Sequence, residues 1–160
     1  MPNTGENGNP YDLKWLIIIF DRTLKYQSMN NEDMGVVHCA NFIDIGNIIE
    51  GYKDQQLILF VSTEDTHTEE LQEMLVQHTE LIQMVYVYPS ADPSIECSKV
   101  IVDNPKVNHI SFEQDIQREL IRVQMNQFNL QADTFRQAGD TQLGDLFEEK
   151  AIELSKQLYH

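Results

Sequence analysis

Polar side chains follow several of the most apolar runs in the sequence, at positions where they could carry chemistry. Asp21 comes directly after residues 14–20, Ser62 and Thr63 follow residues 57–61, and Ser90 lies just beyond residues 84–88. If these runs are parallel strands, their carboxyl ends share the edge of the sheet where such folds bind ligands. Phosphoryl transfer is the chemistry to consider there, because it depends on positioning and charge neutralisation.

Two other kinds of site lack support in the sequence. No Gly-x-Gly-x-x-Gly motif follows the first apolar run and no Gly-Lys-Ser/Thr motif occurs, so backbone cradling of a phosphate is not indicated. The five histidines show no i, i+4 pair: His38, His67, His78, His109 and His160. We therefore expect neither a nucleotide cofactor nor a histidine-based metal site.

The apolar runs read as buried strands. Residues 14–20 form a continuous run rich in β-branched side chains, which is typical of a strand covered on both faces of a parallel sheet. Residues 36–39, 57–61 and 84–88 repeat the pattern, and residues 107–110 repeat it more weakly.

Helical patterns separate most of these strands. Phe42, Ile45, Ile48 and Ile49 have helical spacing before Gly51, and a second pattern from Leu71 to Leu81 follows an acidic first turn. Strands that alternate with helices predict a parallel sheet with right-handed crossovers. Residues 22–34 lack apolar periodicity, so we expect a short or irregular first crossover.

The sequence changes character after residue 112. A long Gln-rich stretch of helical periodicity runs to Gly139-Asp140, and a second helix follows. The second helix carries a regular apolar seam, formed by Leu143, Phe147, Ala151, Leu154 and Leu158. Such a seam is typical of helix packing. We interpret Leu143, Phe147, Leu154 and Leu158 as an interaction surface, with a possible homodimer through these helices.

Composition limits the partners. The 160 residues contain 11 Lys and Arg against 26 Asp and Glu, a net charge of -15 that repels nucleic acid and anionic lipid surfaces. No apolar run approaches the ~20 residues of a membrane helix. Residues 1–11 do not resemble a signal peptide, so we expect a flexible lead-in. Cys39 and Cys97 match no metal spacing and predict free thiols in the cytoplasm.

The order of elements from about Leu13 to Gln124 resembles the response-regulator receiver, a five-stranded flavodoxin-like fold. A working receiver has an acidic pair after the first strand, which holds magnesium, and an acceptor Asp after the third strand. It also has a hydroxyl residue after the fourth strand and a Lys after the fifth. Here Asp21 is followed by Arg22, the third run ends in Ser62, Ser90 is displaced by Pro89, and Lys106 precedes the fifth run. The resemblance therefore implies a degenerate receiver.

In their short hydrophobic motifs, residues 57–62 and 78–88 resemble a receiver-like module. That module lies at the N-terminus of multidomain proteins that carry helical repeats or ADP-ribosyltransferase domains. Residues 135–140 with 147–154 resemble a tetratricopeptide-type helix turn, in which Gly144 stands where such repeats prefer Ala. These resemblances imply a signalling or protein-interaction role.

Residues 19–24, Ile-Phe-Asp-Arg-Thr-Leu, also resemble the nucleophile strand of haloacid-dehalogenase-like phosphatases. That resemblance implies Asp21 as nucleophile, Thr63 as the second motif, and Lys99 with Asp103 as a lysine and a metal-binding strand over residues 100–103. The general acid of that family is replaced by Thr23, and Asn104 stands where a second acid is common.

We therefore predict a three-layer α/β fold with a mainly parallel five-stranded sheet over residues 12–112, and a helical hairpin over residues 113–160 that packs on it or on a partner. The predicted role is non-catalytic regulation or binding of a protein partner or a neighbouring domain, without a cofactor. A divergent metal-dependent phosphatase that uses Asp21 is the alternative.

Overall fold

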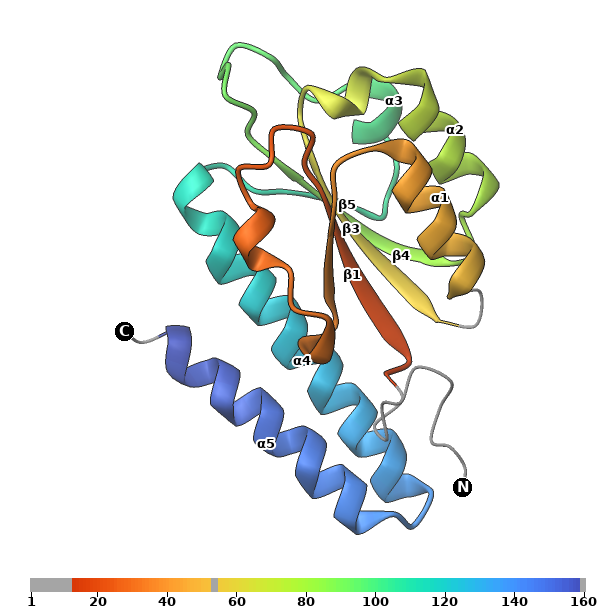
Figure 1. The fold of residues 1–160 in the computed structure, drawn as a ribbon, viewed down its shortest axis with the longest axis vertical. Coiled ribbons are helices and arrows are strands. Elements are labelled where there is room, and N and C mark those ends of the chain that lie inside the picture. Colours follow the sequence, from red (N-terminus) through yellow and green to blue (C-terminus); the bar gives the residue numbers. More distant parts are fainter. Residues whose placement is uncertain (1–12, 53–54, 159–160) are drawn as a thin grey trace. The chain divides into compact units, whose positions relative to one another are not determined.

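A parallel sheet organises the first part of the chain (Figure 1). The computed structural model describes residues 13–52 and 55–158; the predicted flexible lead-in, residues 1–11, lies outside them. Within the described residues the strands are β1 (Trp15–Phe20), β2 (Val36–Cys39), β3 (Gln56–Ser62), β4 (Ile82–Tyr88) and β5 (Val107–His109). They pair in parallel in the order β2-β1-β3-β4-β5. This is the flavodoxin-like order, and it confirms the predicted sheet.

The crossovers after β2, β3 and β4 contain helices α1 (Phe42–Gly51), α2 (Glu69–Gln77) and the short α3 (Lys99–Val102). The side chain of Asn41 accepts a hydrogen bond from the Asp44 amide at 2.9 Å and so caps α1. A 3-10 turn, Asp65–His67, precedes α2. Helix α2 ends before Leu81, which the sequence pattern had included in it.

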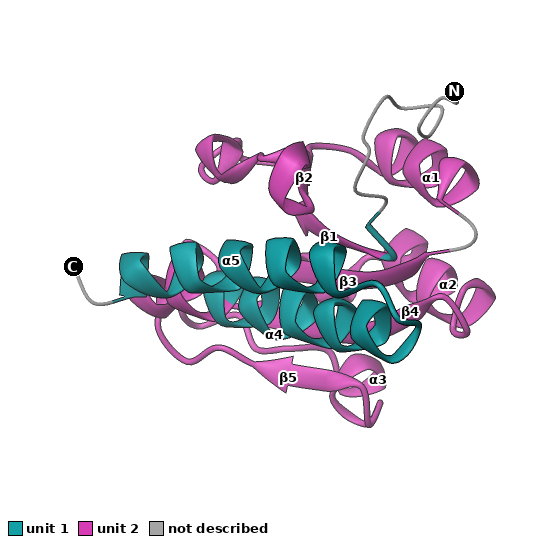
Figure 2. Ribbon diagram, turned by 90° about the horizontal axis from the view of Figure 1, so that it is seen from below, with its two compact units in different colours: residues 1–14, 120–160 teal, residues 15–119 magenta. Residues whose placement is uncertain are grey.

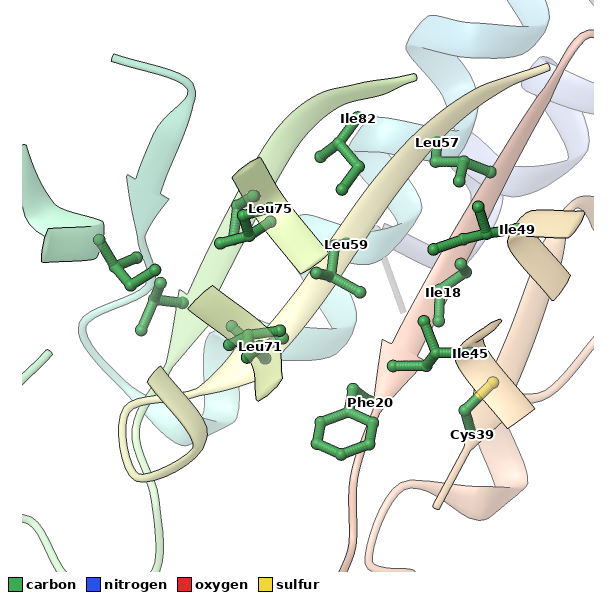
Figure 3. Packing of buried hydrophobic residues seen from close by; sticks show 14 of the residues in the cluster. Ile18, Phe20, Cys39, Ile45, Ile49, Leu57, Leu59, Leu71, Leu75 and Ile82 are labelled. Atoms are coloured by element: carbon green, nitrogen blue, oxygen red, sulfur yellow. The ribbon is translucent and has the colours of Figure 1, made fainter. Parts of the chain in front are cut away.

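The hydrophobic core lies between one face of the sheet and these three helices (Figure 3). Alternate residues of β1 and β3 point into it, among them Ile18, Phe20 and Leu59. Ile45 of α1 and Leu71 of α2 are fully buried against this face. Strand β1 is buried at all six positions, as its continuous apolar run predicts for a central parallel strand.

The first crossover contains no α-helix, which confirms the irregular segment expected from residues 22–34. Two 3-10 turns, Gln27–Met29 and Glu32–Met34, replace it. Gly35 then has a left-handed φ of 79°, and a Cβ at this position would overlap the ring of Trp15. Glycine is therefore required here by both the backbone conformation and the space.

The chain divides into two compact units within helix α4 (Ile116–Gln137) (Figure 2). Unit 2, the α/β unit, covers residues 15–119. The described part of unit 1, the helical unit, is residues 13–14 and 120–158. A 3-10 turn, Glu113–Asp115, leads into α4, so the regular helix begins four residues after Phe112.

The helical unit is a hairpin of α4 and α5 (Thr141–Leu158). Gly139 ends α4 with a φ of 89°, and Asp140 accepts a hydrogen bond from the Leu143 amide at 3.0 Å, which starts α5. The predicted break at Gly139-Asp140 is confirmed. Phe147 packs edge-on against Phe128 and Phe135 of α4, with ring centroids 5.8 and 5.1 Å away.

Gly144 marks a close approach of the two helices. A Cβ there would lie 2.6 Å from Cγ of Arg136 and 3.1 Å from the Ala132 carbonyl oxygen. Arg136 is fixed by Asp145 at 2.8 Å and Glu148 at 2.6 Å. Glycine at position 144 therefore has a steric reason. Of the predicted interaction set, Phe147 and Leu154 are buried, while Leu143 and Leu158 are half-buried.

Candidate functional site

A pocket of about 400 Å³ opens at the carboxyl edge of the sheet, within the α/β unit. The loops after β1, β3 and β4 form it, as expected for a doubly wound fold. Its lining residues are Asp21, Arg22, Thr23, Lys25, Tyr26, Ser62, Glu64, Asp65, Tyr88, Pro89, Ser90 and Ala91.

Asp21 lines this pocket and is buried, with 3% of its surface exposed. Its Oδ1 accepts hydrogen bonds from the Thr23 hydroxyl at 2.6 Å and the Thr23 amide at 3.2 Å. Its Oδ2 accepts from the Tyr26 amide at 2.7 Å and lies 3.1 Å from Nε2 of His38. Both oxygens are thus engaged by groups of the chain itself.

Burial and hydrogen bonding shift the pKa of Asp21 in opposite directions. Burial alone would raise the pKa of its carboxyl group, because a charged group loses hydration. The hydrogen bonds from Thr23, Tyr26 and His38 stabilise the carboxylate more, so the pKa lies below its ordinary value. Asp21 is therefore a charged, structurally bound carboxylate at neutral pH.

His38 was not predicted as part of this site. It lies on β2 in register with Ile19 of β1, and its side chain is only 6% exposed. The signal was indirect: parallel pairing places the end of β2 beside the end of β1, where Asp21 lies. Without the strand register, the sequence could not select His38 from five histidines.

A second carboxylate, that of Asp65, is paired with a cation of the same chain. It forms an ion pair with Arg22, and its amide donates to Oγ of Ser62 at 3.1 Å. The Asp65 side chain is 6% exposed, whereas that of Arg22 is 45% exposed. Asp65 follows β3 by three residues, in the 3-10 turn, and Ser62 is the last residue of the strand.

Hydrogen bonds also tie the strand ends to one another. Thr63 donates from its hydroxyl to Oγ of Ser90 at 3.1 Å, and the Ser90 amide donates to Oγ1 of Thr63 at 3.2 Å. The Tyr88 hydroxyl donates to the Phe20 carbonyl at 2.8 Å. Burial, and then the nearby carboxylates of Asp21 and Asp65, raise the pKa of Tyr88. Tyr88 is thereby held as a neutral hydrogen-bond donor, and Thr63 joins the end of β3 to Ser90.

The residues of the phosphatase alternative are dispersed. Asp21 lines the pocket, and Thr63 lies next to it, but neither Lys99 nor Asp103 belongs to the lining. The expected metal-binding strand over residues 100–103 is wrong, because residues 99–102 form α3 and Asp103 ends that helix. Lys106 donates to the carbonyls of Thr79 and Ile82, before and at the start of β4, and so lies away from the carboxyl edge.

The residues at the carboxyl edge do not fit the magnesium ion of a working receiver. A carboxylate offers about four lone-pair positions, and four donors of the chain already face the oxygens of Asp21. Across residues 13–52 and 55–158, no group of three or more His, Cys, Asp or Glu side chains could hold a metal ion.

The two cysteines do not form a disulfide. Cys39 and Cys97 are both free, as predicted. Burial, and then the charge of Asp44, raise the pKa of Cys39 to about 12. Its thiol is therefore protonated and unreactive at neutral pH.

Comparisons with known proteins identify no relative: no family model matches the sequence, and neither a curated protein nor a solved structure is significantly similar to it. In the described part of the chain, no helix combines the length and apolarity needed to cross a membrane.

Proposed function

We propose that this chain is a non-catalytic regulatory or protein-interaction module built on a receiver-like fold. The observation that supports this best is the state of Asp21. Its two oxygens face four donors from Thr23, Tyr26 and His38. A nucleophile needs a free lone pair directed at the substrate, and a metal ligand needs one directed at the ion. In Asp21 the hydrogen bonds use these lone pairs to hold the loop after β1.

The position of the phosphoryl acceptor supports the same proposal. Strand β3 ends in Ser62, whose hydroxyl accepts the Asp65 amide, and the buried carboxylate of Asp65 is paired with Arg22. A module that acts without phosphorylation needs only the shape of this edge, so it can keep the fold without the phosphoryl-transfer site of a receiver.

The proposal extends to partners and compartment. A protein partner or a neighbouring domain is the expected ligand, and the half-buried Leu143 and Leu158 of α5 are available for a homodimer. Two free cysteines fit a reducing compartment such as the cytoplasm.

Phosphatase and phosphotransfer assays test the non-catalytic role. The protein is incubated with p-nitrophenyl phosphate and Mg²⁺, and separately with radiolabelled acetyl phosphate. We expect no turnover and no stable label above the background of Asp21→Asn, with Asp33→Asn as an exposed carboxylate control. Magnesium-dependent hydrolysis that Asp21→Asn abolishes, with an unchanged circular dichroism spectrum, would establish the phosphatase alternative instead.

A further inference from the structure

The loop after β1 holds an apolar side chain in an unfavourable position. Leu24 has a φ of 63°, in the left-handed region, and 52% of its surface is exposed. Among the described residues other than glycine, it is alone in having a positive φ. Strained backbone that the surrounding contacts enforce is concentrated at functional sites, because strain and exposure both have a cost that folding alone does not require.

An ion pair connects this loop to the segment before α4, which contains a second exposed apolar residue. Lys25 pairs with Glu113, which precedes α4, so the chain neighbours of this pair are Leu24 on one side and Phe112 on the other. Phe112 is 61% exposed. Leu24 thus stands in sequence between two lining residues, Thr23 and Lys25, and Phe112 precedes the ion-pair partner of Lys25.

Both cations of the pocket lining are matched by carboxylates, which leaves the pocket with a net negative charge. Arg22 is matched by Asp65, Lys25 by Glu113, and Asp21 is bound by His38 and backbone amides. Glu64 is an exposed lining residue whose side chain forms no ion pair or hydrogen bond within the described part of the chain, although its carbonyl accepts the His67 amide. The whole chain adds a net charge of -15, which attracts cations over a longer range.

Two aromatic rings form part of the pocket wall. Tyr26 and Tyr88 lie edge to face with their ring centroids 5.3 Å apart, and both rings belong to the lining. The ammonium group of Lys25 already lies 5.7 Å from the centroid of the Tyr26 ring. Both rings are buried and Lys25 already supplies the cation beside Tyr26, so the side chain of Glu64 is left as the group that an incoming cation would meet.

We propose that the carboxyl-edge pocket binds a basic protein segment: a Lys or Arg side chain enters beside Glu64, and an adjacent apolar side chain covers Leu24. Charge complementarity favours this occupant over an acidic or phosphorylated one, because the lining cations are already paired. The inference rests on the proposed role as an interaction module and specifies the chemistry of the partner.

Amide shift changes on titration with a short peptide test the proposal. Acetyl-Leu-Arg-Leu-amide is added to the ¹⁵N-labelled protein, with acetyl-Leu-Glu-Leu-amide as the charge-reversed probe. We expect saturable shifts in residues 21–26, 62–65 and 88–91 with the Arg peptide alone. Glu64→Lys should weaken this binding about tenfold, since reversal replaces one exposed charge attraction by a repulsion.

Glu73→Lys is the matched control, because Glu73 is exposed on α2, lies outside the lining, and gives the same change in net charge. It should alter the affinity by less than about twofold, since distant surface charges are screened. A second variant, Leu24→Asn, keeps a residue that tolerates positive φ; it should weaken binding without lowering the melting temperature.

Three results would overturn the pocket assignment: no shifts in these loops, equal weakening by both Lys variants, or equal binding of the Glu peptide. None of them affects the proposed non-catalytic role, which the phosphatase assay tests separately. Conversely, Asp21-dependent turnover would refute that role whatever the peptide does.

Discussion

Replacing Asp21 by Asn should destabilise the protein without removing an activity. The side chain keeps its shape, but an NH₂ group replaces one of the two carboxylate oxygens. If it replaces Oδ2, the imidazole of His38 can change tautomer and accept from the new amide, whereas the Tyr26 amide, now 2.7 Å from a donor, cannot. A donor left without a partner in a buried site costs about 1–3 kcal/mol.

The loss of charge adds to this cost. The remaining hydrogen bonds from Thr23 are made to a neutral acceptor, and charge-assisted bonds are about twice as strong as neutral ones. We therefore expect Asp21→Asn to lower the free energy of unfolding by about 2–4 kcal/mol at pH 7, a large part of the roughly 5–15 kcal/mol typical of a domain. Urea unfolding followed by circular dichroism measures it.

The pH dependence gives an independent check. The pKa of Asp21 is lowered in the folded protein, so its contribution is complete above the unfolded pKa of about 4 and is lost as the pH falls through the folded pKa. The difference between wild type and Asp21→Asn should therefore shrink on acidification from pH 7 to about pH 3. Asp33→Asn, at an exposed site, should stay within about 0.5 kcal/mol of wild type throughout. A cost below about 1 kcal/mol for Asp21→Asn, with no change in the gap across this pH range, would refute the structural role.

Three further predictions concern the fold. Gly35→Ala should cost about 2–5 kcal/mol, because left-handed φ and overlap with Trp15 add together; urea unfolding with a normal midpoint would show that this loop can relax. Leu59→Ala should also cost about 2–5 kcal/mol by opening a cavity in central strand β3, and a cost under about 1 kcal/mol would contradict the packing. Leu143→Asp with Leu158→Asp should shift any dimer toward monomer in analytical ultracentrifugation while the circular dichroism spectrum is kept; unchanged self-association would exclude the α5 surface.

The sheet could be predicted from the sequence because its strands are buried on both faces. A parallel strand covered on both sides has to be apolar at every position, and residues 14–20 and 57–61 show this directly. The helices α1 and α2 follow from spacing and capping signals. Spacing alone does not place the ends of α2 and α4: α2 ends at Gln77 although Leu81 keeps the apolar spacing, and a 3-10 turn separates Phe112 from the start of α4.

The segment at residues 99–103 shows the limit of this reasoning. Lys-Val-Ile-Val-Asp has the composition of a short strand, yet residues 99–102 form one turn of helix. Ile101 reaches the core from that turn, while Val100 and Val102 are exposed. A run of three apolar residues is too short for periodicity to distinguish strand from helix, so tertiary packing decides.

The site was harder to predict than the fold, because its residue types mislead without their contacts. Asp21 resembles a nucleophile in sequence, but its role follows from the missing helix after β1. In the irregular segment that follows β1, the carboxylate accepts the amides of Thr23 and Tyr26 and also lies 3.1 Å from Nε2 of His38 on the neighbouring strand. The carboxylate thus fixes the loop that contains Leu24, whose surface is 52% exposed. If the proposed partner covers Leu24, the apolar surface removed from water would contribute to binding.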